Sequence, residues 1–355
     1  MQPIMISENF SISGKPLTCE PFGHGHINST YKLTTDAGCA YVLQRINKYV
    51  FTNPPQLMNN ASRVTNFIRA KGSLALHFIK EAGGTYCFQD EDGEYWRCYE
   101  FVEGFSMDAA ETAEDFYQSA LAFGQFQDQL SDFPADTLYE TIPNFHNTPE
   151  RLRQLKDSIA ADSAGRLASA KPEVEFFLAN EARASILQQM LNEGKLPLRV
   201  THNDTKLNNV LLDNDTHKPK CVLDLDTVMP GLSAYDFGDS IRFGGNTAAE
   251  DEPDASKMKL DAEKFRAFTK GFLEAAPSLT DTEVSVLALG AFTITLEIGS
   301  RFLADYLNGD KYFRTAYPEH NLIRARTQIA LCADMLNRWD EMEGIVAQVA
   351  KEVRG

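Results

Sequence analysis

One short polar run contains residues whose types and spacing could do chemistry. It spans residues 202–209 and reads HNDTKLNN, so that Asp204 stands two positions after His202 and five before Asn209. A carboxylate such as Asp204 can orient an alcohol and accept its proton, and an amide oxygen such as that of Asn209 can bind a divalent metal. Phosphoryl transfer from a nucleotide to an alcohol needs both tasks. We therefore expect Asp204, Asn209 and, as a hydrogen-bonding brace for the loop, His202 to form the catalytic core.

Two further carboxylates follow in an apolar segment. Residues 220–226 read KCVLDLD, which predicts a strand and places Asp224 twenty residues after Asp204. Alternation along a strand would put Asp224 and Asp226 on the same face. Each aspartate could simply cap a turn, but two carboxylates beside buried leucines require a cation. We therefore predict magnesium ligands at Asn209, Asp224 and Asp226.

Asp236, in the run YDFGDSIR at 235–242, has two possible roles. Its carboxylate could accept hydrogen bonds from the backbone of residues 202–209 and keep Asp204 in place. It could equally cap a helix that begins near residue 237. The two roles are compatible, and the sequence leaves both open.

Composition limits the class of protein. The chain has 355 residues, 43% of them hydrophobic, and a formal net charge of −16. That charge argues against nucleic acid and against an anionic membrane surface as partners. The six cysteines form no C-x-x-C pair and the N-terminus lacks the pattern of a secretory signal, so we expect reduced thiols and a cytoplasmic protein. The apolar stretch 284–296 predicts a buried helix, being too short and polar to span a bilayer.

The expected elements divide the chain into two lobes. Strands are expected at 17–23, 30–34, 40–46, 85–90 and 95–102, with a helix from about residue 55. Beyond a hinge at 100–104 we expect helices at 111–131, 148–162, 172–193, 261–275, 280–307 and 320–353, with strands at 209–213 and 220–226. The prediction is an α+β chain with a β-rich lobe at 1–103 and a mainly helical lobe at 104–355. The acidic stretch 248–256 is expected to be a solvated loop.

The order of loop, strand, aspartate and helix resembles the aminoglycoside phosphotransferase and choline kinase superfamily, whose members are relatives of protein kinases. Longer stretches are more similar to the N-acetylhexosamine 1-kinases, and they include GHGHINSTY at 23–31, VLQRINKYVFTNP at 42–54, CYEFVEG at 98–104, THNDTKLNN at 201–209 and LDLDTVMPGLSAYDFGDSIRFGGNT at 223–247. The resemblance covers most of the chain. It implies a bilobal protein-kinase-like fold, ATP and Mg²⁺ as cofactors, and a small-molecule acceptor.

The same resemblance implies a nucleotide site in the first lobe. Gly23 and Gly25 would cover the phosphates, and Glu100 and Val102 would lie at the hinge that binds adenine. Arg45 would take the place of the usual strand lysine, with Gln44 as its neighbour. The helix from residue 55 holds no acid to pair with that cation, so Asn59 or Asn60 would hydrogen-bond it instead.

For the acceptor, polar residues gather in the last third of the chain. Candidates in contact with sugar hydroxyls are Arg301, Tyr306, Arg314, Tyr317, His320, Asn321 and Arg324, and Phe243 could stack on a sugar ring. A salt-bridged helix surface would explain most of them equally well. Arg301 stands out, because a charge on an apolar helix requires a partner or a ligand.

Three functions fit these observations. The first is phosphorylation of the anomeric hydroxyl of an N-acetylhexosamine by a monomer or small homo-oligomer. The second is the same chemistry on a cationic acceptor such as an aminoglycoside or choline, which the acids at 250–252 would suit and the arginines after residue 290 would not. The third is a nucleotide-binding regulator without turnover.

Overall fold

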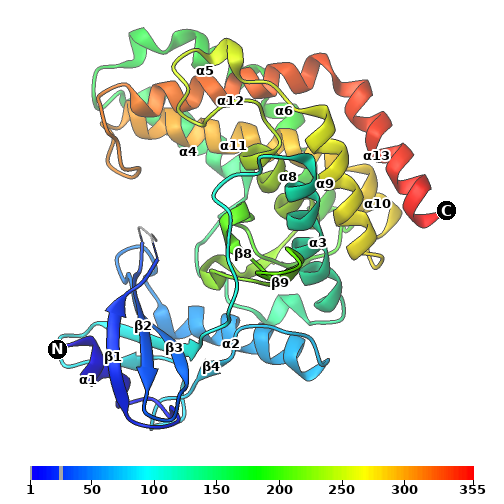
Figure 1. Cartoon of the computed structure of the whole chain (residues 1–355). Helices are drawn as coiled ribbons and strands as arrows, with labels where there is room; N and C mark the ends of the chain where they lie inside the picture. Colours follow the sequence, from blue (N-terminus) through cyan, green and yellow to red (C-terminus); the bar gives the residue numbers. More distant parts are fainter. Residues whose placement is uncertain (1, 24–26) are drawn as a thin grey trace. The chain divides into compact units, whose positions relative to one another are not determined.

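The structure is a computed structural model of the chain and describes residues 2–23 and 27–355 (Figure 1). The chain forms two compact units. The first comprises Met1–Phe105, Asp132–Pro143 and Leu211–Pro230, and the second Ser106–Ser131, Asn144–Val210 and Gly231–Gly355. The first unit thus takes two stretches from beyond residue 104, which the expected lobe boundary had assigned to the second lobe. The boundary between functional lobes stays a prediction.

An antiparallel sheet dominates the first unit. Its strands are β1 (Pro16–Pro21), β2 (Ser29–Thr35), β3 (Ala40–Ile46), β4 (Phe78–Ile79), β5 (Phe88–Gln89) and β6 (Tyr95–Glu100). They lie in the order β1-β2-β3-β6-β4, and β5 pairs with β6. Gly38, at φ 76°, makes the tight turn from β2 to β3 that the run Asp-Ala-Gly predicts. The hairpins expected from the sequence are therefore present.

Two helices complete this unit, α1 (Pro3–Ser7) and α2 (Pro54–Ala70). The second begins where the sequence predicts, because the Asn53 side chain accepts from the Gln56 N–H and a proline fills the first turn. One face of the sheet packs in an apolar cluster that includes Ile6, Leu43 and Trp96. Because side chains alternate along β3 and β6, the residues next to those in the cluster point to the other face of the sheet.

The hairpin expected from strands at 209–213 and 220–226 ends earlier than predicted. It pairs β8 (Val210–Leu212) with β9 (Pro219–Val222), and a 3₁₀ turn at Leu225–Thr227 and the short strand β10 (Met229–Gly231) follow. Asp224 takes a left-handed conformation with φ 53°, which aspartate tolerates better than most residues. The expectation that Asp224 and Asp226 share one face of a strand is therefore wrong, since neither lies in a strand.

The second unit is helical apart from the short strand β7 (Arg199–Thr201). Its helices are α3 (Ala113–Gln129), α4 (Thr148–Ala161), α5 (Lys171–Ala179), α6 (Glu181–Ala184), α7 (Ile186–Asn192), α8 (Ser233–Gly244), α9 (Ala262–Ala275), α10 (Asp281–Ser285), α11 (Leu287–Leu307), α12 (His320–Asn337) and α13 (Trp339–Arg354). Three long helices expected from periodicity are broken, at residues 180 and 185, at Val286 and at Arg338. The α+β class is confirmed.

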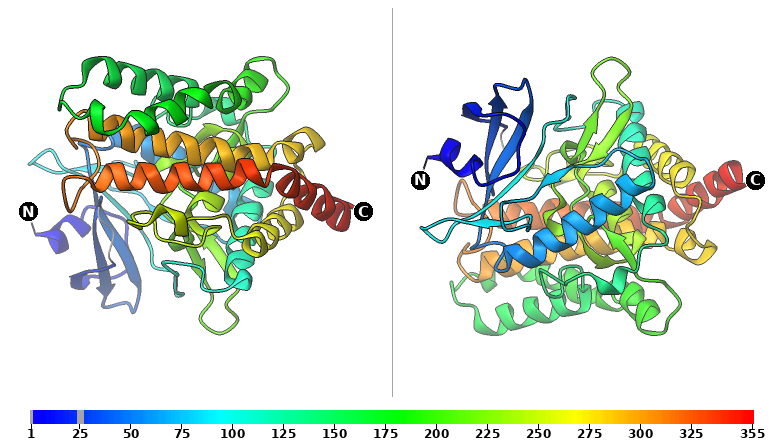
Figure 2. Two further views of the ribbon diagram at one scale, coloured as in Figure 1. Left: turned by 90° about the horizontal axis from the view of Figure 1, so that it is seen from above. Right: turned by 90° about the horizontal axis from the view of Figure 1, so that it is seen from below.

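Helix α11 forms the centre of this unit and packs against α4, α8 and α12 (Figure 2). By length and composition it could cross a membrane, but 83% of its most apolar 18-residue window is buried inside the protein. The buried helix expected here is present, but it begins at Leu287 and so is shorter than the helix predicted at 280–307. Its contact with α8 is unusually close, because a Cβ on Gly238 would lie 2.3 Å from the Gly290 carbonyl oxygen. The backbones of α8 and α11 therefore touch.

Candidate active site

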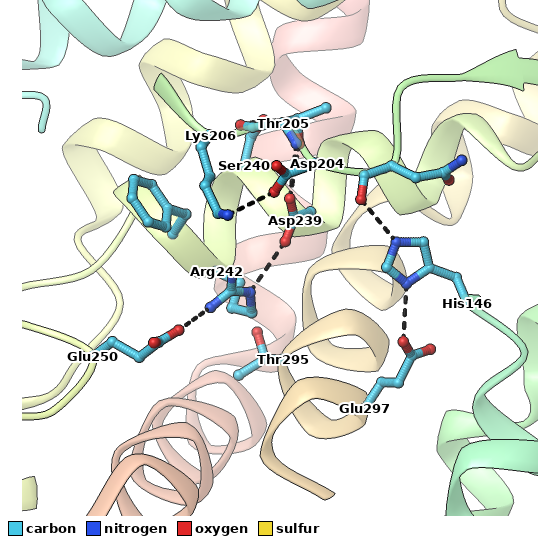
Figure 3. Close-up of polar contacts among 12 residues, drawn as sticks. His146, Asp204, Thr205, Lys206, Asp239, Ser240, Arg242, Glu250, Thr295 and Glu297 are labelled. Atoms are coloured by element: carbon cyan, nitrogen blue, oxygen red, sulfur yellow. Dashed lines mark hydrogen bonds and ion pairs between the residues drawn. The ribbon is translucent and has the colours of Figure 1, made fainter. Parts of the chain in front are cut away.

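The polar run 202–209 follows β7 and ends in a 3₁₀ turn at Leu207–Asn209. Asp204 lies in this run, and both of its carboxylate oxygens have partners. Lys206 Nζ is 2.9 Å from Oδ1 (Figure 3). Asn209 Nδ2 donates to Oδ2 at 3.2 Å. Asn209 Nδ2 also donates to the Asp204 carbonyl oxygen at 2.8 Å. Because Nδ2 makes both bonds, the amide oxygen of Asn209 is the end that could bind a metal. The Asp204 side chain remains 26% exposed and can meet a substrate.

Lys206 was missed in the sequence, although it stands only two positions after Asp204. Burial lowers the pKa of Lys206, but the charge of Asp204 and the hydrogen bond to it outweigh burial, so the pKa is raised overall. The side chain is therefore a cation beside the carboxylate. In phosphoryl transfer a cation at this place can balance the charge of the transferring group.

Asp236 anchors the backbone of the loop. Its carboxylate accepts from the N–H groups of His202 at 2.9 Å and Asn203 at 2.8 Å, and from Gln127 Nε2 at 2.6 Å. Of the two roles open in the sequence, the structure shows this one. The other possible role, an N-cap of the following helix, is wrong, because α8 already begins at Ser233. Burial raises the pKa of Asp236 more than these donors lower it.

His202 braces the same loop from within. Its ring is fully buried against Phe123 and Phe126, with ring centroids 5.5 and 5.9 Å away. Its Nδ1 accepts from the Asp204 N–H at 3.4 Å. The histidine thus contacts the peptide group of Asp204 and not its carboxylate, which suits a supporting role.

A buried chain of charges continues from the loop to the acidic stretch. The Thr205 N–H donates to Asp239 Oδ2 at 2.8 Å, Arg242 Nε donates to Asp239 Oδ1 at 3.1 Å, and Arg242 Nη1 donates to Glu250 at 2.7 Å (Figure 3). Burial raises the pKa of Asp239, but the charges of Arg242, His146 and Lys206 lower it below its usual range.

The stretch 248–256 is a largely exposed loop, as expected, but its first two acids also form ion pairs. Glu250 pairs with Arg242 and also lies 3.7 Å from Arg324, and Asp251 lies 3.2 Å from His320 Nε2. The Glu250 carbonyl oxygen accepts from the Thr327 hydroxyl at 2.5 Å. These contacts attach the acidic stretch to α8 and α12.

In the first unit, Asp226 has a protein cation as its partner. It is 3% exposed, forms an ion pair with Arg97, and accepts from Asn28 Nδ2 at 2.7 Å. Both oxygens are thus used, and the physical reason for a metal at Asp226 is gone. Asp224 is exposed on its left-handed turn. Across residues 2–23 and 27–355, no three histidine, cysteine or acidic side chains form a metal site by themselves.

Arg97 was also missed, and the only signal in the sequence is an arginine inside the aromatic strand YWRCYE. Its Nε donates to Gln44 Oε1 at 2.8 Å. Arg45, the next residue on β3, points to the other face of the sheet, is exposed, and donates to the Ser29 hydroxyl at 3.2 Å. The structure therefore brings Arg97, and not Arg45, to Asp226, and the phosphate-binding role of Arg45 stays a prediction.

Of the other residues expected to bind the nucleotide, all but one are among the residues that the structure describes. Gly23 has φ 76° with open space where a Cβ would lie, and Gly25 is outside the described residues. The Glu100 carboxylate pairs with His77 at 2.9 Å, and the Val102 N–H donates to no described residue.

The role expected for Asn60 or Asn59 is wrong. Asn60 Nδ2 donates to the carbonyl oxygens of Tyr139 and Val228, at 2.8 and 3.0 Å, and Asn59 is exposed. Asn60 therefore joins segments of the first unit and holds no cation.

The acceptor candidates separate into two kinds. Asn321 is fully buried and donates to Asp305 and Asp310, both at 2.9 Å, so a substrate contact is excluded by its burial. Tyr317 is 38% exposed and stacks on His320. Phe243 is half-buried beside the Arg242 guanidinium, 6.0 Å from it.

Arg301 became a candidate because it is a charge on an apolar helix that needs a partner or a ligand. It forms no ion pair with any described residue, and its guanidinium lies 5.4 to 5.9 Å from the rings of Phe145, Tyr312 and Phe313. Burial lowers the pKa of the neighbouring Arg151, and the charge of Arg301 lowers it further. Two neighbouring arginines without an acid partner favour a neutral or anionic ligand.

Comparison with known proteins gives the class. The profile of the phosphotransferase enzyme family (APH) matches residues 18–270, and the chain belongs to this family. It is a small-molecule phosphotransferase.

Three solved structures are similar over nearly the whole chain. One is an aminoglycoside phosphotransferase from Alicyclobacillus acidocaldarius subsp. acidocaldarius DSM 446, with 15% identity, a TM-score of 0.63, and coverage of 100% of this chain and 97% of that one. A microcompartment-associated aminopropanol kinase has 14% identity, a TM-score of 0.66, and coverage of 96% and 97%. An amicoumacin kinase in complex with AMP-PNP, Ca²⁺ and Ami has 14% identity, a TM-score of 0.62, and coverage of 92% of both chains. The protein-kinase-like fold expected from the sequence is confirmed.

Proposed function

We propose that the protein is an ATP- and magnesium-dependent kinase that phosphorylates the anomeric 1-hydroxyl of an N-acetylhexosamine. The observation that carries the proposal is the arrangement around Asp204. A partly exposed carboxylate lies beside a lysine and an asparagine, on a loop whose backbone is held by two buried aspartates. Such a group can be aimed at an incoming hydroxyl without reorganisation.

In this mechanism each group of the loop has one task. Asp204 accepts a hydrogen bond from the sugar hydroxyl, orients its oxygen toward the terminal phosphate of ATP, and takes its proton as the new bond forms. Lys206 balances negative charge on the transferring group. Bound magnesium would neutralise the phosphates, and the Asn209 amide oxygen and the exposed Asp224 carboxylate are the hard oxygen ligands that suit it. ATP as the donor is supported by the nucleotide complex of the amicoumacin kinase.

The acceptor part of the proposal rests on the longer sequence similarities and on Arg301. A cationic acceptor was attractive because of the acids at 250–252. Two of these acids, Glu250 and Asp251, are paired with Arg242 and His320 inside the unit. They are therefore less able to attract an amine, whereas Arg301 and Arg151 would repel one. Aminoglycosides and choline remain the second candidate, because one of the similar solved structures is an aminopropanol kinase.

A panel of acceptors tests the proposal. We expect purified protein with Mg-ATP to release ADP with N-acetylglucosamine or N-acetylgalactosamine, and the product to show a sugar 1-phosphate by phosphorus NMR. Glucose, galactose, choline, 1-amino-2-propanol and kanamycin serve as matched acceptors. Turnover with an amine and none with a sugar would replace the first candidate by the second. ATP binding without turnover on any acceptor would favour the regulator.

A further inference from the structure

A buried histidine and a buried glutamate have no role in the proposed mechanism. His146 precedes α4 and is 6% exposed, and Glu297 lies on α11 and is fully buried. His146 Nδ1 is 2.9 Å from Glu297 Oε1 (Figure 3). The Thr148 hydroxyl donates to Glu297 Oε2 at 2.8 Å. A charged pair with so little exposure is costly to bury unless its geometry serves a purpose.

The other side of the histidine ring reaches the candidate active site. His146 Nε2 is 3.2 Å from the Asn203 carbonyl oxygen. That oxygen belongs to the peptide group between Asn203 and Asp204. The N–H of the same peptide group donates to His202 Nδ1, and the N–H of Asn203 donates to Asp236. Both polar atoms of the peptide group between Asn203 and Asp204 therefore have a side-chain partner.

The backbone needs this support, because Asn203 has φ 65°. Asparagine adopts the left-handed region more readily than most residues, but this conformation is still uncommon outside glycine and depends on the surrounding contacts. Rotation of the Asn203–Asp204 peptide group would change ψ of Asn203 and φ of Asp204, and would turn the Asp204 side chain. The hydrogen bond from His146 opposes this rotation.

We propose that His146, held in place by Glu297, is a positioning residue that fixes the peptide group before Asp204 and so aims the Asp204 carboxylate. The kinetic part of this proposal rests on the proposed function, since it takes Asp204 as the group that orients the acceptor. The structural part, that His146 holds the turn at Asn203, does not depend on it.

Both ring nitrogens face acceptors, which defines the charge of the ring. A carbonyl oxygen can only accept, so Nε2 must carry a hydrogen, and a carboxylate opposite Nδ1 requires a second one. The charged or titratable groups that face the ring are Glu297 on α11, and Asp239 and Tyr235 on α8. Burial lowers the pKa of His146, but the charge and hydrogen bond of Glu297 and the charge of Asp239 raise it overall.

The sign of the pH effect follows from the raised pKa. The stability that His146 contributes is fully present below the pKa of an unfolded histidine, about 6.5, and is lost as the pH rises through its higher folded value. The free energy of unfolding of the wild type should therefore fall at alkaline pH. This alkaline fall should be smaller in a variant without the histidine.

Two substitutions separate the two contacts of His146. The amide nitrogen of His146→Gln can take the place of Nε2 and donate to the Asn203 carbonyl, whereas that of His146→Asn matches only Nδ1 and reaches Glu297. With Mg-ATP and N-acetylglucosamine we expect His146→Asn to lower kcat on the order of 10- to 100-fold. His146→Gln should stay within about threefold of wild type, and KM for ATP should be unchanged in both. His217→Asn is the matched control, because it makes the same substitution on an exposed histidine between β8 and β9.

Hydrogen exchange makes the same test without turnover. Mass spectrometry of peptides that cover residues 202–206 should show faster exchange in His146→Asn than in His146→Gln or wild type. If no acceptor is phosphorylated, the proposed function fails while this difference still tests the role of His146. Equal exchange in the two folded variants, or an equal loss of kcat in both, would overturn the proposal.

Discussion

Asp204→Asn should lower kcat by about 10²- to 10⁴-fold and leave the Kd for Mg-ATP within about twofold of wild type. The substitution keeps the size of the side chain but removes the acceptor of the hydroxyl proton. The new amide can still accept from Asn209 or Lys206 through its oxygen, so the loop should keep its shape. The loss should therefore appear in the chemical step and not in binding.

Kinetics with the best acceptor, together with calorimetric titration of Mg-ATP, would measure both quantities. Asp215→Asn is a suitable control, because it makes the same change on an exposed residue between β8 and β9. A variant at position 204 with wild-type kcat would show that another group receives the proton. A variant that loses ATP binding as well would indicate that Asp204 acts mainly through the nucleotide.

Arg97→Leu should destabilise the first unit by about 3–5 kcal/mol. The guanidinium is the cation that neutralises Asp226, and both side chains are at most 3% exposed. Its removal leaves a buried carboxylate with only Asn28 as a partner. The double variant Arg97→Leu with Asp226→Leu should recover most of the loss, because it removes the uncompensated charge.

Fluorescence during urea unfolding can follow the first unit if Trp339 is replaced by phenylalanine, since the chain has two tryptophans and the other is Trp96 on β6. Lys48→Gln in the same background is the control. It removes a partly exposed ion pair with Glu94, for which about 0–1 kcal/mol is expected. If Arg97→Leu cost no more than this control, the buried pair of Arg97 and Asp226 would not stabilise the first unit.

Local patterns predicted much of this fold. The strands β1 to β3, the hairpin of β5 and β6, and helices α2, α3, α4 and α9 lie within a few residues of their expected bounds. The breaks at Val286 and Arg338 were not foreseen, because neither proline nor glycine marks them and the apolar pattern runs through. They are imposed by packing, which periodicity does not contain.

The site shows a similar division. Asp204 and Asn209 were found because catalysis requires them at a fixed spacing within one loop. Arg97 and the pair of His146 and Glu297 were missed because their partners are 129 and 151 residues away in the sequence. No local rule connects such residues. The left-handed turn at Asp224, which ended the expected strand, is likewise a single-residue conformation that periodicity cannot show.

The contact between Gly238 and Gly290 limits how this protein can acquire new acceptors. Helix α8 carries Asp236 and Asp239, helix α11 carries Glu297, and the two helices touch backbone to backbone. Any larger residue at the crossing would displace all three carboxylates and, with them, the loop of Asp204. Divergence of substrate range within such a lineage is therefore expected in the segments that extend from these helices, such as residues 245–261 and 308–319, while the crossing itself stays fixed.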